Sequence, residues 1–95
     1  MAGGWVYIVT NRPNGTLYVG VTGDLPRRAH QHRTGAVEGF SKRYGLKRLV
    51  HAEHHPDIRE AIRREKAIKR WSRASKIRLI HEQNPDWSDL YDILL

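Results

Sequence analysis

The stretch that most constrains the fold runs from Trp5 to Thr22, where two short runs rich in Val, Ile, Tyr and Thr flank Asn14-Gly15. An Asn-Gly pair accepts the positive φ angles of a tight turn. The pattern therefore predicts an antiparallel hairpin with strands 5–10 and 16–22. A two-residue turn then predicts three pairs across the strands: Pro13 with Thr16, Tyr7 with Thr22, and Val9 with Gly20.

The two faces of this hairpin differ in character, because side chains alternate along a strand. The hydrophobic face consists of Val6, Ile8, Leu17, Val19 and Val21. The tyrosine face consists of Tyr7, Tyr18, Gly20 and Thr22. The missing side chain of Gly20 leaves room there for another backbone or a ligand. The pattern alone allows the two tyrosines to be half-buried strand residues or parts of a site.

A helix is expected directly after the hairpin, from Leu25 to Thr34. Asp24 is a good N-cap and Pro26 suits the first turn, while Gly35 suits the end. The stripe at helical spacing comprises Leu25, Arg28, Ala29, His32 and Ala36, whereas Arg27, His30 and Arg33 fall on other faces. An inward guanidinium is costly without an anion, so Arg28 requires a carboxylate, a phosphate or a wet cleft.

The glycines of residues 35–45 predict a loop. It carries Lys42, Arg43 and Tyr44, a combination that can contact a phosphate backbone and stack on a base. The alternative is a loop tucked against the domain by its aromatic residues. Residues 46–55 predict a third strand with imperfect alternation. Its histidines, with those of the first helix, are expected to be exposed or bound to nucleic acid rather than to ligate a metal.

A long helix is expected from Asp57 onward, with an apolar stripe that contains Glu65 near its centre. The stripe comprises Ile58, Ala61, Ile62, Glu65 and Ile68, and Glu60 points away. A carboxylate on an apolar face must be neutralised, protonated or face a hydrated cleft. A salt bridge to Arg28 or Lys69 is one explanation, and a functional carboxylate is the other.

The remainder of the chain predicts a break at Trp71 with Ser72 as N-cap, a helix over 74–83 and a turn over 84–88. Residues 88–95 are expected to form a short helix or tail that packs on the sheet or against another chain.

Charge is concentrated in one segment. The net charge of the 95-residue chain is +7, and residues 58–78 contain nine Lys or Arg and two Glu, which accounts for the whole excess. Such a focus favours a polyanion such as nucleic acid, although a solvated helix face is the alternative. The residues expected to contact nucleic acid in this segment are Lys69, Arg70, Arg73 and Lys76.

Length and composition predict one domain over residues 1–95, because the chain is too short for two independent cores. The absence of cysteine excludes disulfides and thiolate metal sites. No apolar run approaches the roughly 20 residues that cross a membrane, and a leader pattern is missing. A cytoplasmic protein without membrane contact is therefore expected.

The ordered combination Trp5-Val6-Tyr7, Tyr18-Val19-Gly20 and Arg28 resembles the GIY-YIG nuclease domain in its small single-domain bacterial form. RREKAIKRWSRASK and NPDWSDLY resemble the helical half of those proteins. The chain departs from the name-giving motif at Trp5-Val6 and at Val19, changes that affect packing more than chemistry. An α+β fold is expected, with a three-stranded antiparallel sheet flanked by helices in the order strand, strand, helix, strand, helix, helix.

The resemblance implies a metal-dependent endonuclease that hydrolyses phosphodiester bonds, with DNA the expected substrate and repair or recombination the expected context. Tyr18 or Tyr7 would serve as general base, Arg28 would bind the phosphate and His32 would assist proton transfer. Glu65 would be the single protein ligand of Mg²⁺ or Mn²⁺. The products would carry a 3′-hydroxyl and a 5′-phosphate.

A late asparagine of the family corresponds to Asn84, which suits a helix C-cap equally well. Two other classes of function stay open. One is a nucleic-acid-binding module that keeps the cleft without chemistry. The other is an interaction protein that docks through residues 90–95.

Overall fold

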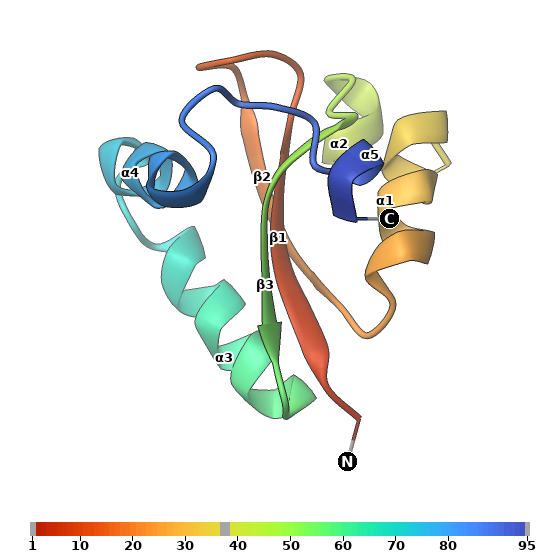
Figure 1. The fold of residues 1–95 in the computed structure, drawn as a ribbon, viewed down its shortest axis with the longest axis vertical. Helices are drawn as coiled ribbons and strands as arrows, with labels where there is room; N and C mark the ends of the chain where they lie inside the picture. Colours follow the sequence, from red (N-terminus) through yellow and green to blue (C-terminus); the bar gives the residue numbers. More distant parts are fainter. Residues whose placement is uncertain (1, 37–38, 95) are drawn as a thin grey trace.

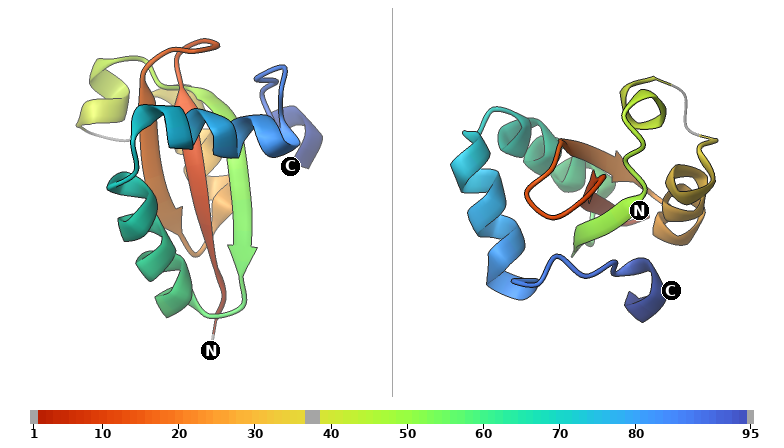
Figure 2. Two further views of the ribbon diagram at one scale, coloured as in Figure 1. Left: turned by 90° about the vertical axis from the view of Figure 1, so that its left-hand side faces the viewer. Right: turned by 90° about the horizontal axis from the view of Figure 1, so that it is seen from above.

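A computed structural model of the protein describes residues 2–36 and 39–94. Its middle layer is a three-stranded antiparallel sheet in the order β2-β1-β3, formed by β1 (Gly4–Thr10), β2 (Leu17–Thr22) and β3 (Arg48–His55) (Figure 1). Two helices cover one face, α3 (Ile58–Lys69) and α4 (Arg73–Gln83). The other face is covered by α1 (Leu25–Thr34), α2 (Phe40–Arg43) and α5 (Tyr91–Leu94) (Figure 1, Figure 2). The predicted α+β fold is confirmed.

Two of the three long helices begin at the predicted N-caps, Asp24 and Ser72, and the third begins after Asp57, the residue from which a helix was predicted. The side chains of Asp24, Asp57 and Ser72 each accept a hydrogen bond from a backbone N–H group of the following turn. Gly35, with a φ of 75°, ends α1 in the left-handed conformation. The segment 35–45 was expected to be a loop throughout, and this was wrong because it contains the single-turn α2. Val37 and Glu38 of that segment lie outside the described residues.

The hairpin register differs from the prediction by two residues. Tyr7 lies opposite Gly20 rather than Thr22, and Val9 lies opposite Tyr18 rather than Gly20. The cause is a longer loop, in which Gly15 N donates to Arg12 O at 2.9 Å and Asn14 has a φ of 56°. Proline and then a left-handed asparagine at the two central positions are typical of a type II turn, which does not continue directly into two paired strands.

The predicted faces are confirmed despite the wrong register, because a shift of two residues preserves the alternation. The hydrophobic face packs under α3 and α4 in one core, whose buried members are Val6, Ile8, Val19, Val50, Ala61, Ile68, Leu79, Ile80 and Trp87. The tyrosine face packs under α1 in a second core, whose buried members are Tyr7, Val9, Leu25, Ala29, Leu46 and Leu49. The sheet therefore separates two cores.

A β-bulge explains the imperfect alternation of the third strand. Ile8 lies opposite His51 and Val9 lies opposite Leu49, so Val50 has no partner on β1. The extra residue lets Val50 join the core under α3, next to Ile8, while Leu49 stays in the core under α1.

The C-terminal segment packs back on the molecule, as one of the two alternatives for it predicted. Leu90 N donates to Leu49 O at 2.7 Å, and α5 lies beside α1 (Figure 1). Ile93 is 69 % exposed. Leu95, the last residue of the predicted docking segment, lies outside the described residues. Within residues 2–36 and 39–94, no helix has the length and apolar character needed to cross a bilayer.

Asn84 holds the turn after α4 against β3. Its amide nitrogen donates to Val50 O at 3.1 Å and to Ser88 O at 2.9 Å, and its amide oxygen accepts from Ser88 N at 3.0 Å. The residue is buried. These bonds support the helix-end role considered for Asn84, since the amide joins backbone groups rather than the tyrosines.

We expect Asn84→Ala to lower the free energy of unfolding by about 2–3 kcal/mol, because buried backbone groups at the bulge and turn lose their partner. Urea denaturation followed by circular dichroism measures this loss. The exposed neighbour provides the control, and Gln83→Ala should change the stability by less than about 0.5 kcal/mol. Equal stability of Asn84→Ala and the wild type would contradict the structural role.

Candidate active site

Tyr7 lies at the centre of the candidate site because the residue opposite it is a glycine. A Cβ atom on Gly20 would clash with the phenol ring of Tyr7, so the room predicted at Gly20 is filled by that ring. Tyr7 is 3 % exposed, and its hydroxyl lies 2.9 Å from His32 Nε2 on α1. The hydrogen bond joins the central strand to the first helix.

His32 faces the sheet because it is seven residues from Leu25 and three from Ala29 on the buried stripe of α1. Burial, and then the positive charge of Arg28, lower the pKa of His32 to about 4. The imidazole is therefore neutral near pH 7.

Burial, and then the neighbouring Tyr18, raise the pKa of the Tyr7 phenol well above its usual value. The protonated phenol and the neutral imidazole therefore share a hydrogen bond between two uncharged groups. His32 Nδ1 is the one buried side-chain polar atom without a hydrogen-bond partner in the described part of the chain.

Arg28 lies at the rim of the site rather than in the core. Its side chain is half-buried and lines a hollow of about 310 Å³ at the start of α1, together with Thr22, Gly23, Asp24, Arg27 and Gln31. No carboxylate among the described residues forms an ion pair with it. Of the three predicted explanations for an inward guanidinium, the structure supports the wet cleft. The charge of Arg28 also lowers the pKa values of Tyr7 and His32.

Glu65 lies on α3, which covers the face of the sheet opposite to α1 (Figure 1). Its side chain is 11 % exposed, and its negative charge contributes to the raised pKa of Tyr7. Lys69 Nζ lies 2.9 Å from Glu65 Oε2, one helical turn further along α3. The predicted salt bridge to Lys69 is thus present, and Arg28 is not the partner. Glu60 is exposed, as expected.

Tyr18 completes the cluster from the edge strand β2. Its ring centroid lies 6.5 Å from that of Tyr7 and 5.7 Å from that of His32. Tyr18 is half-buried, in contrast to the fully buried Tyr7. Tyr7, Tyr18 and His32 therefore form one cluster of rings, and the charges of Arg28 and Glu65 both act on the pKa of the Tyr7 phenol.

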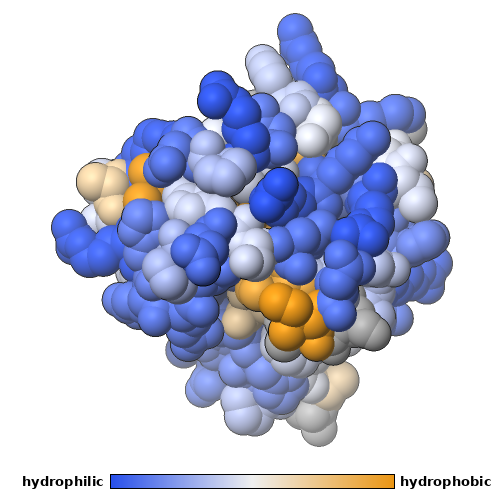
Figure 3. All heavy atoms as spheres, turned by 45° about the horizontal axis from the view of Figure 1, so that its top comes forward, coloured by the Kyte–Doolittle hydropathy of each residue, from blue (hydrophilic) through white to orange (hydrophobic). Residues whose placement is uncertain are grey.

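The predicted nucleic-acid contacts divide into two groups. Lys42, Arg43 and Tyr44 are exposed at α2 and the turn after it, with the Arg43 guanidinium 5.7 Å from the Tyr44 ring centroid. The molecular face in Figure 3 is mainly hydrophilic, with a compact hydrophobic patch below its centre and a smaller hydrophobic group towards the left edge.

The second group consists of Lys69, Arg70, Arg73 and Lys76. Two of these four side chains have partners within the fold. Lys69 pairs with Glu65, and Arg73 Nη2 donates to the carbonyls of Asn14 and Gly15 at 2.7 Å each. Arg73 therefore holds the hairpin loop against α4. Arg70 is exposed, and Lys76 is half-buried.

Sequence reasoning missed a charged cluster on β3. His51 and His55 each lie 3.2 Å from a carboxylate oxygen of Glu53, and Arg64 Nε donates to it at 2.7 Å. Burial alone would raise the pKa of Glu53, but these hydrogen bonds lower it to about 2. The signal was the spacing of two along the strand, which puts all three β3 side chains on one face. Among the described residues, no group of three or more His, Cys, Asp or Glu side chains is arranged so that it could hold a metal ion.

A second missed interaction fixes the C-terminal segment. Arg33 Nη2 lies 2.7 Å from Asp89 Oδ2, Arg33 Nη1 lies 3.4 Å from Asp92 Oδ1, and its guanidinium lies 4.2 Å from the Tyr91 ring centroid. The sequence placed Arg33 outside the buried stripe of this helix and predicted no contact for it. Nothing in the local pattern of α1 indicated contacts more than 50 residues away.

The sequence model of the GIY-YIG catalytic domain matches residues 3–78, a range that includes all five residues of the candidate site. The chain belongs to the GIY-YIG family. This places it in a nuclease-type family and indicates interaction with nucleic acid. The GIY-YIG positions are occupied here by Trp5-Val6-Tyr7 and Tyr18-Val19-Gly20.

Among GIY-YIG relatives, the chain is similar to small proteins named UPF0213. It is 35 % identical over 79 residues to the UPF0213 protein of Staphylococcus aureus, covering 83 % of this chain and 95 % of the relative. A UPF0213 protein of Staphylococcus saprophyticus is 35 % identical over 78 residues, covering 82 % and 94 %. The solution NMR structure of a UPF0213 protein from Bacillus halodurans superposes with a TM-score of 0.57 at 30 % identity, covering 92 % of each chain.

The buried His32 predicts a specific pH dependence of stability. Its folded pKa of about 4 is below the ordinary 6.5, so the unfolded chain binds the proton first as the pH falls. The contribution of His32 is complete above pH 6.5 and is lost between pH 6.5 and 4. We expect a loss of about 2 kcal/mol between pH 7 and pH 5, measured by urea denaturation at each pH.

Two variants distinguish the contribution of His32 to this pH dependence from that of the other histidines. His32→Gln, which cannot titrate, should abolish most of this pH dependence, whereas His54→Gln at an exposed position should retain it. An unchanged slope in His32→Gln would show that the imidazole titrates normally in the folded protein.

Proposed function

We propose that this GIY-YIG protein is a metal-dependent endonuclease that hydrolyses phosphodiester bonds, with DNA as substrate and DNA repair or recombination as its context. The observation that carries the proposal is the cluster around Tyr7. Its phenol is hydrogen-bonded to His32 and lies beside the Tyr18 ring, and the charges of Arg28 and Glu65 both act on its pKa. Phosphodiester hydrolysis needs a proton acceptor, a cation at the phosphate and a metal ligand, and this cluster contains a candidate for each.

Glu65 would hold the divalent ion, Mg²⁺ or Mn²⁺. The donor set fits such an ion, because Mg²⁺ keeps several waters and needs only one or two carboxylates, and the Glu65 side chain retains contact with solvent. A bound ion would polarise the phosphate and the attacking water. Lys69 provides the counter-charge to Glu65 in this structure, and its half-exposed side chain can turn towards solvent.

Arg28 would bind the scissile phosphate. Its guanidinium has no described carboxylate partner and borders the hollow at the start of α1, so an incoming phosphate has no competing ion pair to displace. Guanidinium and phosphate form charge-assisted, often bidentate, hydrogen bonds.

The burial of the two phenols supports different roles for them. Tyr7 is buried, and its hydroxyl is hydrogen-bonded to His32 Nε2, so Tyr7 and His32 form a positioning pair. Tyr18 is half-buried on the edge strand, where it can meet substrate. A phenol has an ordinary pKa of about 10, so a tyrosine base needs positive charge nearby, which Arg28 and a bound ion would supply. We therefore assign the proton of the attacking water to Tyr18.

A second candidate is a nucleic-acid-binding module that performs no chemistry. The Glu65–Lys69 ion pair favours it, because a lysine beside the carboxylate can replace the metal ion permanently. Such a module would bind DNA with strong salt dependence, would not respond to Mg²⁺, and would form no product.

We expect Glu65→Gln and Arg28→Gln each to reduce Mg²⁺-dependent cleavage of a labelled DNA panel by about 100-fold or more, with the fold intact by circular dichroism. Glu60→Gln removes the same charge from the exposed side of α3 and should cleave at the wild-type rate. Native cleavage by Glu65→Gln would refute the metal assignment. Absence of cleavage by the wild type with any divalent ion, despite tight binding, would favour the second candidate.

Substitution of the two tyrosines should affect different properties, the cleavage rate for Tyr18 and the stability for Tyr7. Tyr18→Phe should lower the cleavage rate by about 100-fold or more at unchanged stability, because it removes the proton acceptor. Tyr7→Phe should lower the free energy of unfolding by about 1–2 kcal/mol, because it leaves the buried His32 without its partner. Rates and urea denaturation are measured on both variants. The reverse pattern would make Tyr7 the base.

A further inference from the structure

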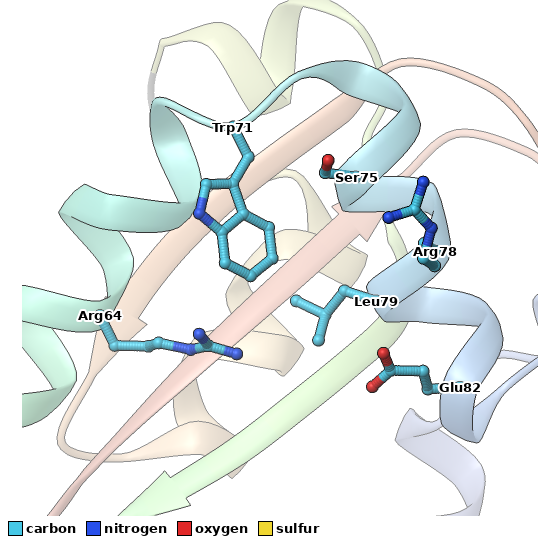
Figure 4. Close-up of a pocket in the computed structure, with 6 residues that line it drawn as sticks. All are labelled: Arg64, Trp71, Ser75, Arg78, Leu79 and Glu82. Atoms are coloured by element: carbon cyan, nitrogen blue, oxygen red, sulfur yellow. The ribbon is translucent and has the colours of Figure 1, made fainter.

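A second hollow lies on the opposite side of the sheet from the tyrosine face, between α3 and α4 (Figure 4). Its volume is about 330 Å³, at the lower end of the range of small-molecule sites. It is lined by Arg64, Trp71, Ser75, Arg78, Leu79 and Glu82. None of these residues belongs to the candidate active site, and none is explained by the chemistry proposed for it.

The aromatic wall of this hollow is held in place before any ligand arrives. Trp71 packs with Leu79 against the core under α3 and α4. The Arg64 guanidinium lies 5.0 Å from the Trp71 ring centroid and is fixed by two hydrogen bonds to Glu53, at 2.7 Å and 3.4 Å. An indole fixed in this way can stack on a flat ring at little cost in conformational entropy.

Two charged groups on α4 face the same space without pairing. Arg78 and Glu82 are one helical turn apart and both are exposed, but neither forms an ion pair or a hydrogen bond with any described residue. Figure 4 shows the Glu82 carboxylate and the Arg64 guanidinium pointing towards each other across the hollow. Arg64 Nη1 makes no hydrogen bond to a described residue and remains available to a ligand.

The mixture of charges restricts the ligand. Residues 58–78 carry a net charge of +7, which attracts phosphate. Glu82 would repel a phosphate, so its position in the hollow requires a ligand that also brings hydrogen-bond donors. An aromatic wall, a carboxylate and guanidinium groups together suit a nucleotide, with its base inside the hollow and its phosphate at the rim.

We infer that the hollow between α3 and α4 binds a guanine nucleotide. Guanine has two adjacent donors, N1–H and the N2 amino group, which match the two oxygens of Glu82. It also has two adjacent acceptors, O6 and N7, which match a guanidinium such as Arg64. Adenine and cytosine present a ring acceptor beside their amino group, and thymine and uracil present a single donor. Trp71 stacks on the base, and Arg78 binds the phosphate.

The nucleotide can be free in solution or an unpaired guanine of a nucleic-acid strand. Arg64 and Glu65 are consecutive on α3, so the same helical turn contributes to this hollow and to the candidate active site. A bound strand that crosses α3 would reach both. The strand form rests on the proposed function, whereas the free-nucleotide form does not.

The test measures binding in EDTA, without cleavage, by titrating the ¹⁵N-labelled protein with GMP, AMP, CMP and UMP. Trp71→Phe assigns the indole N–H signal of Trp71 among the three tryptophans. We expect GMP to shift that signal and to bind about tenfold more tightly than AMP. Glu82→Gln should remove the preference for guanine, and Arg78→Gln should weaken all four nucleotides alike. Glu60→Gln, outside the hollow, should behave as the wild type.

A second arm uses short single strands that differ in one base, guanine or thymine. A guanine preference in the strands that Glu82→Gln removes supports the strand as source. A response to GMP without strand binding supports the free nucleotide and counts against the proposed function. The nucleotide site is refuted if the Trp71 signal moves with neither ligand, or if the preference for guanine persists in Glu82→Gln. Mg²⁺-dependent cleavage by the same protein would still support the proposed function.

Discussion

The hydrogen bond between the Tyr7 hydroxyl and His32 Nε2 connects β1 to α1 at the candidate site. The neighbouring residues hold its two groups in position. Gly20 leaves the space that the phenol ring occupies on the sheet. Leu25 and Ala29 seat α1 on that same face, so that the histidine further along the helix meets the phenol. Because both partners are buried, neither can exchange the other for water. The bond therefore fixes the distance between the central strand and the first helix.

The charge distribution of the candidate site is arranged around this hydrogen bond. A neutral imidazole and a protonated phenol form an uncharged centre, with Arg28 at its rim and Glu65 on the other side. The cation and the carboxylate form no ion pair with each other, and each keeps contact with solvent. A phosphate and a divalent ion could therefore each meet a partner of opposite charge. Within the described part of the chain, the Glu65–Lys69 ion pair is the one interaction that competes with this arrangement.

Much of the fold could be predicted because it depends on local rules. Asp24, Asp57 and Ser72 start helices by capping chemistry, and alternation assigned Tyr7 and Tyr18 to one face even though the register was wrong by two residues. The bulge at Val50 could not be predicted, since it depends on which strand pairs with β3. The side-chain contacts divide in the same way into those that follow from local patterns and those that depend on distant segments. Helical spacing directed His32 and Glu65 inward, but the contacts of Arg33 and Arg73 join segments more than 50 residues apart.

The central proposal is that Tyr7, Tyr18, Arg28, His32 and Glu65 form one site, in which Glu65 would hold the divalent ion. The most direct measurement is paramagnetic relaxation by Mn²⁺, observed on side-chain resonances of the labelled protein without nucleic acid. The account predicts that low Mn²⁺ concentrations broaden the signals of these residues first, and that Glu65→Gln abolishes the effect. Broadening centred on Glu53 or on Asp89 and Asp92, with the tyrosine signals unchanged, would contradict it.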